Sequence, residues 1–266
     1  MGPYPQQSGT ASVDVQLGFE RACLSDLLRL LGVAQEVDAL SDAYPLRRVP
    51  VSAGAVLYHE GAPAKSISFV TAGSFKVYRT AEDGYEQVLS FVGKAGILGL
   101  DGLDRHQHPS TTVALEDGLI LVLSHLAVLE PDARAPALGR VLHRAASRQL
   151  QCCADVVDLM AAVAAEVRLA RFLLQLSAHL QADGASGRLL QLRMCRRDIA
   201  SYLGLAHETV SRSFSTLVRW GCLRVDNREV EILDLPRLAA LALNTRGLVE
   251  RGRCSGAPSI VGATLA

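Results

Sequence analysis

The hydrophobic and polar positions between about residues 46 and 126 repeat with the period of a β-strand. Residues 66–72 and 74–80 alternate between apolar and polar side chains, and the alternation resumes over residues 85–92. The intervening Glu82-Asp83-Gly84 is typical of a tight hairpin turn. Glycines recur through this region at intervals that suit many short strands. The pattern predicts an antiparallel barrel or roll.

The period changes after Pro136 to that of a long helix with two apolar stripes. Each stripe follows the 4-3 spacing of helices that pack along their length. The first stripe contains Leu138, Leu142, Ala145, Gln149, Cys152, Val156, Leu159 and Val163, and the second Ala146, Leu150, Cys153, Val157, Met160 and Ala164. A helix that is buried on all sides within its own domain would explain both stripes. The alternative is that one stripe packs on the strand-rich domain and the other on the same helix of a second chain.

Residues 196–217 carry two short apolar patterns at helical spacing, joined by a turn. The apolar positions are Ile199, Ala200 and Leu203 in the first pattern and Val210, Phe214 and Leu217 in the second. Gly204 in the turn can adopt a left-handed backbone conformation without steric cost. The pattern predicts a helix-turn-helix. An ordinary helical hairpin with a solvated polar side is the alternative, because many small helical pairs look similar.

The second of these helices would bury its apolar side and expose Glu208, Ser211, Arg212 and Ser215 on the opposite side. These side chains suit DNA base edges, since Arg can bind guanine O6 and N7 together and Glu can accept from cytosine N4. Residues 221–232 alternate on both sides of Asp226-Asn227, which indicates a hairpin and hence a winged helix-turn-helix. Between residues 186 and 228 there are eight Arg and three acidic residues, so positive charge gathers where DNA phosphates would lie.

Three short segments, Asp198-Ile199, residues 202–205 and residues 208–212, resemble the recognition motif of CRP/FNR-type bacterial transcription regulators. The Glu-x-x-Ser-Arg form is similar to the FNR branch, whose members read a TTGAT-type half-site. The cyclic-AMP receptor branch has Gly where Ser211 stands. The resemblance spans about residues 23–245. It implies that Glu208, Ser211 and Arg212 read bases and that Arg196 contacts a phosphate, with Arg197, His207 and Thr209 as further candidates for DNA contact.

The resemblance also implies an α+β fold with an antiparallel β-roll similar to cyclic-nucleotide-binding domains, a long dimerisation helix and a C-terminal winged helix-turn-helix. We expect a flexible lead-in at residues 1–22, the β-roll sensor domain at 23–130, the helix at 131–164, the DNA-binding domain at 165–245 and a flexible tail at 246–266. The implied dimer interface contains Leu142, Leu150, Cys153 and Val157. Two recognition helices held by this axis would meet successive major grooves of a palindromic site.

Composition fits a globular DNA-binding protein. The chain has 266 residues, of which 49% are hydrophobic and 20% charged, and its formal net charge is 0. No early segment has the form of a secretion signal, and no stretch approaches the roughly 18 uninterrupted apolar residues that span a bilayer. We therefore expect no membrane contact and a cytoplasmic location. Cysteines at positions 23, 152, 153, 195, 222 and 254 show no paired CxxC spacing, which indicates reduced thiols.

The expected sensor domain lacks the ligands for two signals known in the family. Members that bind cyclic AMP have an acidic residue where Ile97 stands and an Arg-Ser/Thr pair, but residues 108–111 contain no arginine. A buried phosphate charge would go uncompensated, so cyclic-AMP binding is not expected. An iron-sulfur cluster needs four thiolates. Cys23 is the one cysteine near the N-terminus and Leu121 stands about where the central ligand would be, so no cluster is expected.

Some features of the sequence would also suit a metal enzyme or a ligand-binding protein. His106-x-His108 resembles the metal motif of cupin barrels, but Thr112 and Val113 stand where a cupin needs a carboxylate, and Glu116 comes too late. We therefore expect no metal site and no enzymatic activity. A haem sensor that uses one of the scattered histidines stays an alternative. A ligand-binding adaptor without DNA binding is another, although the intact face of Glu208, Ser211 and Arg212 argues against it.

We interpret the chain as a homodimeric, sequence-specific DNA-binding transcription regulator that recruits or blocks RNA polymerase. Cys195 adds a hypothesis about control, because it stands at the expected N-cap of the first motif helix, three residues before Asp198. Helix N-termini and cations such as Arg196 and Arg197 favour the oxidisable thiolate. Cys195 is therefore a candidate redox brake on DNA binding. The alternative is an inert small residue tolerated at a cap.

Overall fold

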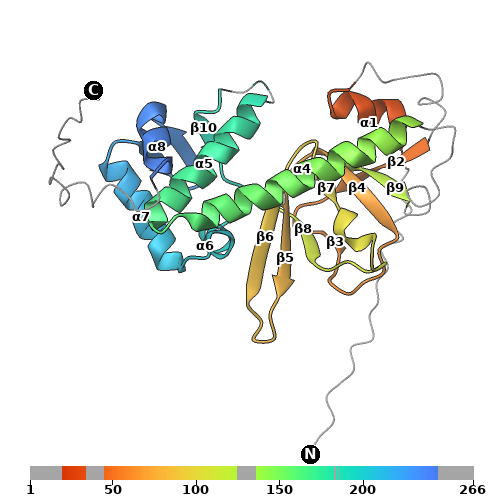
Figure 1. Ribbon diagram of the computed structural model, residues 1–266, viewed down its shortest axis with the longest axis horizontal. Coiled ribbons are helices and arrows are strands. Elements are labelled where there is room, and N and C mark those ends of the chain that lie inside the picture. Colours follow the sequence, from red (N-terminus) through yellow and green to blue (C-terminus); the bar gives the residue numbers. More distant parts are fainter. Residues whose placement is uncertain (1–19, 34–44, 125–135, 183, 185, 245–266) are drawn as a thin grey trace, which may run out of the picture.

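The computed structural model describes residues 20–33, 45–124, 136–182, 184 and 186–244. Figure 1 shows a strand-rich domain at one end, a mainly helical domain at the other, and one long helix, α4 (Pro136–Ala161), that runs between them. The expected tail lies outside the described residues, and so does the expected lead-in up to residue 19. The strand-rich domain begins earlier than the expected boundary at residue 23, because β1 (Glu20–Cys23) already pairs with β2 and buries Ala22.

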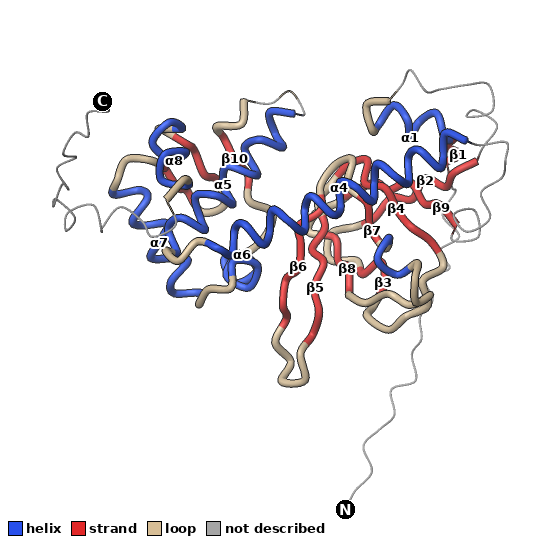
Figure 2. The backbone as a smooth tube through the Cα atoms, in the orientation of Figure 1, coloured by secondary structure: helices blue, strands red, loops and turns tan. Residues whose placement is uncertain are grey.

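The strand-rich domain is formed by two antiparallel sheets, drawn in red in Figure 2. The five-stranded sheet has the order β1, β2 (Pro45–Val51), β9 (Gly118–Ser124), β4 (Ser66–Ala72) and β7 (Ile97–Leu98). The four-stranded sheet has the order β3 (Val56–Tyr58), β8 (Thr111–Ala114), β5 (Phe75–Thr80) and β6 (Glu86–Val92). A short 3-10 helix, η2 (Leu100–Gly102), follows β7. Apolar side chains from both sheets, including Val70, Phe75, Val77 and Ile120, form one buried cluster. The expected β-roll is confirmed.

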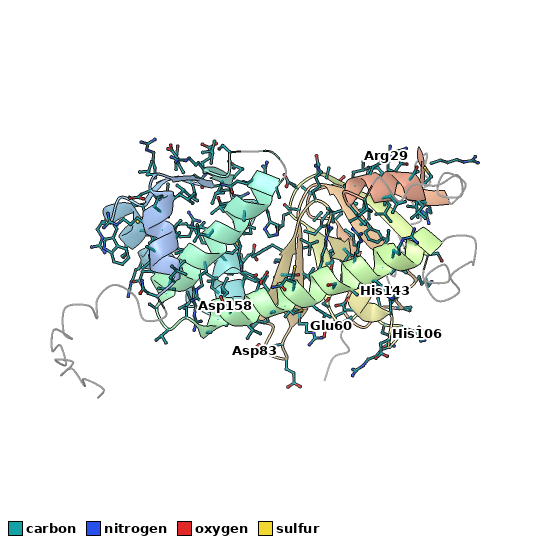
Figure 3. The ribbon with its side chains drawn as sticks, turned by 45° about the horizontal axis from the view of Figure 1, so that its top comes forward. Arg29, Glu60, Asp83, His106, His143 and Asp158 are labelled. Carbon is teal, nitrogen blue, oxygen red and sulfur yellow. The ribbon has the colours of Figure 1, made fainter. Side chains whose placement is uncertain are left out.

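The hairpin between β5 and β6 follows the sequence pattern closely. Its turn uses Gly84 at φ +83°, a left-handed conformation that costs glycine no steric clash. The Asp83 side chain accepts a hydrogen bond from the Tyr85 backbone N–H at 3.0 Å, as Asp commonly does in turns. Figure 3 shows Asp83 near the tip of this projecting hairpin. The strand that follows the turn, β6, is last in the order of the four-stranded sheet and is therefore an edge strand.

The long helix α4 takes part in the cores of both domains. Near its start, Leu138, Val141 and Ala145 are buried against the five-stranded sheet and against α1 (Leu24–Leu30). Near its end, Leu159 is buried in the core of the helical domain. Figure 3 shows His143 and Asp158 in the two halves of the helix. The helix therefore connects two separate hydrophobic cores.

The C-terminal domain is a winged helix-turn-helix, as expected. Its elements are α5 (Ala165–Ala182), β10 (Leu189–Gln191), α6 (Arg196–Leu203), α7 (His207–Arg219), β11 (Leu223–Asp226), β12 (Glu229–Ile232) and α8 (Leu235–Ala242). The wing strands β11 and β12 meet at a turn in which Asn227 has a φ of +50°, and β10 adds a third strand beside β12. Within the described ranges, no helix is long and apolar enough to cross a membrane.

His108 is a buried titratable side chain in the β-roll. Its ring stacks on Tyr58 at 3.7 Å between centroids and is 4% exposed. Its Nδ1 has no hydrogen-bond partner among the residues that the structure describes. Burial lowers the pKa of His108, and the opposing effect of the Asp101 charge is smaller. The unfolded chain therefore takes up a proton near pH 6.5 that the folded chain resists.

We accordingly expect the folding stability to fall as the pH drops from about 7 to about 5, because protonation of His108 is easier in the unfolded state. His108→Phe, which can still stack on Tyr58, should flatten this dependence in urea unfolding measured across that range. His143→Gln is the matched control, since His143 is exposed on α4. An unchanged pH dependence in His108→Phe would show that other groups are responsible.

Candidate nucleic-acid interface

The turn between α6 and α7 is held by backbone geometry and by one arginine. Gly204 ends α6 with φ 61° and ψ 41°, and the next N–H, that of Leu205, donates to Ala200 O at 2.9 Å. The Arg168 guanidinium donates to Leu203 O at 2.9 Å and to Ala162 O at 2.7 Å. These bonds satisfy carbonyl groups at the ends of two helices. The turn is therefore fixed to the end of α4 and the start of α5.

The α7 helix separates an apolar side from a polar side as the sequence predicts. Val210, Phe214 and Leu217 are buried in the domain core. Glu208, Ser211, Arg212 and Ser215 are exposed on the other side, as is His207 at the first helical position, while Thr209 is half-buried. The Ser211 hydroxyl donates to His207 O at 3.2 Å. The charged ends of Glu208 and Arg212 thus remain available to a ligand.

The polar side of α7 also borders an open hollow of about 480 Å³. Its lining consists of Glu166, Ser211, Arg212, Ser215, Thr216 and Arg219. The sequence analysis did not predict that Glu166, Thr216 and Arg219 lie beside this polar side. Arg219 could have been found by extending the helical spacing from Ser215 by four residues, whereas Glu166 comes from the start of α5 and has no local signal. The hollow therefore extends beyond the motif to the start of α5.

The two arginines that begin α6 have different environments. Arg196 places its guanidinium 3.6 Å from the centroid of the Phe214 ring and donates to Asn227 O at 3.3 Å. Burial lowers the pKa of this half-buried Arg196. Arg197 is exposed. Arg196 thus connects α6 to α7 and to the turn of the wing. Arg197 is more exposed than Arg196, so its guanidinium is more accessible to a DNA phosphate.

Cys195 occupies the N-cap position of α6. Its backbone N–H donates to Asp198 Oδ2 at 3.2 Å and its Sγ donates to the same oxygen at 3.1 Å. Burial by itself would raise the pKa of Asp198, but the hydrogen bonds from Cys195 and Lys76 lower it on balance. The Cys195 side chain is exposed. The thiol is therefore both accessible and part of the cap.

Three of the four expected dimer-interface residues stand exposed on one side of α4. Leu150 and Val157 are 72% and 70% exposed, and Cys153 between them is exposed as well. Leu142 differs, because it is half-buried and packs against the cluster formed with α1 and the five-stranded sheet. The exposed stripe is therefore centred on Leu150, Cys153 and Val157.

The β-roll carries an apolar side chain and a tightly packed backbone where related domains bind their ligands. The side chain at the expected acidic position, Ile97, is buried and apolar. An added Cβ at Gly99 or Gly102 would lie 3.1 or 3.2 Å from the His108 ring, so the backbone is packed tightly there. Of the five described cysteines, only Cys152 and Cys153 share an element, α4, and Cys254 lies outside the described residues. Within the described ranges, no three His, Cys, Asp or Glu side chains form a group that could hold a metal ion. The side chain at the expected acidic position is thus apolar, and the described cysteines form no group of three with other metal-binding side chains.

A β-roll joined by a long helix to a winged helix-turn-helix with an exposed polar face defines a DNA-binding transcription regulator with a sensor-type domain. Residues 48–130 match the cyclic nucleotide-binding domain family, and residues 167–241 match the Crp-like helix-turn-helix domain family. The chain belongs to the CRP/FNR family of transcription regulators.

Similar proteins support this assignment in sequence and in structure. The chain is 37% identical over 208 residues to the transcriptional regulatory protein btr of Bordetella pertussis, with 78% of this chain and 86% of the relative covered. It is 35% identical to the transcriptional activator protein FnrA of Stutzerimonas stutzeri, with 78% and 85% covered. The structure of FixK2 from Bradyrhizobium japonicum superposes with a TM-score of 0.66 at 26% identity, covering 74% of this chain and 96% of that one.

Proposed function

We propose that the chain is a homodimer that reads a palindromic TTGAT-like site and regulates transcription through RNA polymerase. The observation that carries this proposal is the polar side of α7, where Glu208, Ser211 and Arg212 are exposed opposite a fully buried apolar side. Arginine and glutamate side chains on a recognition helix can distinguish base pairs in the major groove. Because its partner is chromosomal DNA, the regulator would act in the cytoplasm.

The homodimer is supported by the exposed stripe of Leu150, Cys153 and Val157 on α4. Large aliphatic side chains on a helix seldom stay in water at this spacing, and packing on the same stripe of a second copy would bury them. A two-fold axis along α4 would present two copies of α7 to two half-sites of opposite orientation. The palindrome follows from that symmetry.

The sensor domain is proposed to work without cyclic AMP and without an iron-sulfur cluster. The support is the apolar, buried Ile97 and the spacing of the described cysteines, of which only Cys152 and Cys153 share an element. A haem-dependent sensor of the same fold is the competing proposal. A visible absorption spectrum of the purified protein distinguishes them, since haem and iron-sulfur centres absorb strongly and the protein alone does not.

The experiment that tests the function is genome-wide mapping of the DNA that the protein binds in its host. The expected result is one inverted repeat with TTGAT-like half-sites upstream of transcription starts. Bound fragments that share no inverted repeat would contradict the dimeric readout, and the absence of bound DNA would favour an adaptor without DNA binding.

The exposed thiol of Cys195 is proposed as a redox brake on this DNA binding. Peroxide would transfer one oxygen atom to the sulfur and leave as water, which oxidises the thiol to a sulfenic acid. The sulfenic acid is bulkier than the thiol and carries a negative charge when it is ionised. Its sulfur would also no longer donate a hydrogen bond to Asp198 Oδ2. We expect mild peroxide to weaken operator binding of the wild type through repulsion of the DNA phosphates, and a thiol reductant to restore it.

Cys195→Ser is the control for this prediction, because serine caps helices well and does not form a sulfenic acid. Its operator affinity should be unaffected by peroxide. If peroxide weakened operator binding equally in wild type and Cys195→Ser, the oxidised residue would instead be Cys222 or one of the adjacent Cys152 and Cys153.

A further inference from the structure

The free edge of the β-roll is covered by the first helix of the helix-turn-helix. β6 is an edge strand, and Figure 1 shows α6 lying beside it. Edge strands carry backbone groups that still need hydrogen-bond partners. The Ser201 hydroxyl, almost fully buried, accepts from Val88 N at 2.8 Å and donates to Glu86 O at 2.7 Å. Gln87 Nε2 in turn donates to Ser201 O at 2.9 Å. Ser201 of α6 thus provides hydrogen bonds that a neighbouring strand would otherwise make with β6.

An ion pair between the domains lies beside these hydrogen bonds. Lys76 Nζ on β5 is 2.8 Å from Glu86 Oε2 and 3.0 Å from Asp198 Oδ1 on α6. The Lys76 and Asp198 side chains are only 12% and 15% exposed, so water screens the pair less than a surface ion pair. Burial alone would lower the pKa of Lys76, but the two carboxylates raise it on balance. Lys76 therefore stays charged and bridges β6 to the N-terminus of α6.

Apolar contacts complete the junction between the two domains. Val88 projects from β6 into the hydrophobic core of the DNA-binding domain and is 2% exposed. The Phe91 ring lies 5.2 Å from the Tyr202 ring and 6.1 Å from the Phe172 ring, within the usual range of aromatic pairs. The roll and the helix-turn-helix thus share one core at this point.

We propose that this β6–α6 junction, made by Lys76, Glu86, Gln87, Val88, Asp198 and Ser201, sets the angle at which each subunit presents α7 to DNA. Lys76 on β5 and Ser201 on α6 do not lie on the polar side of α7. They would act on DNA recognition only by positioning α7. The inference rests on the proposed function, because it concerns a dimer that reads a palindrome. α6 and α7 pack into one core and Arg196 joins them, so a rotation of α6 moves α7 as well.

The angle matters because two half-sites must be met at once. Each base pair added to the spacer turns one half-site by roughly 35° relative to the other. A dimer with rigidly held α7 helices therefore accepts one spacer and rejects its neighbours. A dimer whose junction is loosened can adjust, and it should lose that discrimination while each half-site contact stays intact.

The test compares full-length variants on three duplexes: the inverted repeat recovered by genome-wide mapping, the same repeat with one base pair added to its spacer, and a single half-site. Wild type should prefer the natural spacer strongly. Lys76→Met and Ser201→Ala should reduce that preference roughly 5- to 150-fold, the usual size of coupling between sites. Their half-site affinity should equal that of wild type. Lys76→Arg should retain the preference, because it keeps the charge.

Lys65→Met is the matched control, since Lys65 is an exposed lysine of the same domain; its spacer preference should be unchanged. Ser201→Ala leaves the buried Val88 N–H without its acceptor, so Lys76→Met decides alone if the serine variant does not fold. A Lys76→Met protein with full spacer preference would overturn the junction's role. Failure of wild type to bind the repeat would instead overturn the proposed function.

Discussion

Leu150→Glu should give a folded protein that sediments as a monomer and no longer binds the full operator. Leu150 is 72% exposed in the single chain, so a charge there leaves both domain cores intact. In the proposed dimer the same side chain lies in an apolar seam, where an unpaired carboxylate would lose its hydration. Two half-sites linked in one protein commonly gain a factor of about 10² to 10⁴ in affinity over one, and the monomer should lose that gain.

The measurements are sedimentation velocity and operator titration, with circular dichroism as the check on folding. Val56→Glu is the matched control, because Val56 is an aliphatic residue at 38% exposure on β3 of the β-roll and not on α4. It should stay dimeric and bind the operator normally. Val157→Glu, one helical repeat further along α4, should repeat the Leu150→Glu result. A dimeric Leu150→Glu protein would place the interface elsewhere.

Local sequence signals predicted the elements whose contacts are close along the chain. The β5–β6 hairpin, the α6–α7 turn and the wing each depend on a few neighbouring residues, such as Gly84, Gly204 and Asn227. The α1 helix was missed because it is only seven residues long, although Leu24, Leu27 and Leu28 repeat at helical spacing. The helices of the motif and α4 were therefore readable from the sequence, whereas α1 and α5 were not predicted as separate helices.

The junction between the domains could not be predicted, because its partners are distant in the sequence. Lys76 and Asp198 are separated by 122 residues, and Ser201 is 113 residues from Val88. On α6, Asp198 has the pattern of an ordinary capping residue, and only the fold shows that its second oxygen binds Lys76. The contacts of Arg196 with Phe214 and with Asn227 O likewise appear only in the fold, and its phosphate contact stays a prediction.

Arg212→Ala should weaken binding to the cognate operator by about 1 to 3 kcal/mol per half-site while sparing most binding to random DNA. Arg212 is exposed on α7 between Glu208 and Ser215, where a guanidinium can make two hydrogen bonds to one guanine. Its loss removes those bonds but leaves the phosphate contacts that provide non-specific affinity. The half-sites are well separated, so the losses should add in the dimer.

Arg197→Ala provides the contrast, because Arg197 is exposed on α6, whereas the proposed base-reading side chains lie on α7. It should weaken cognate and random DNA alike and reduce the slope of affinity against salt by about one unit, as the loss of one phosphate contact does. Titrations of both variants on both DNAs at several salt concentrations separate the two roles. Base reading by Arg212 requires that its cognate loss exceed its random-DNA loss at every salt concentration. Equal losses on the two DNAs would assign Arg212 to the phosphates and leave Glu208 and Ser211 as the base readers.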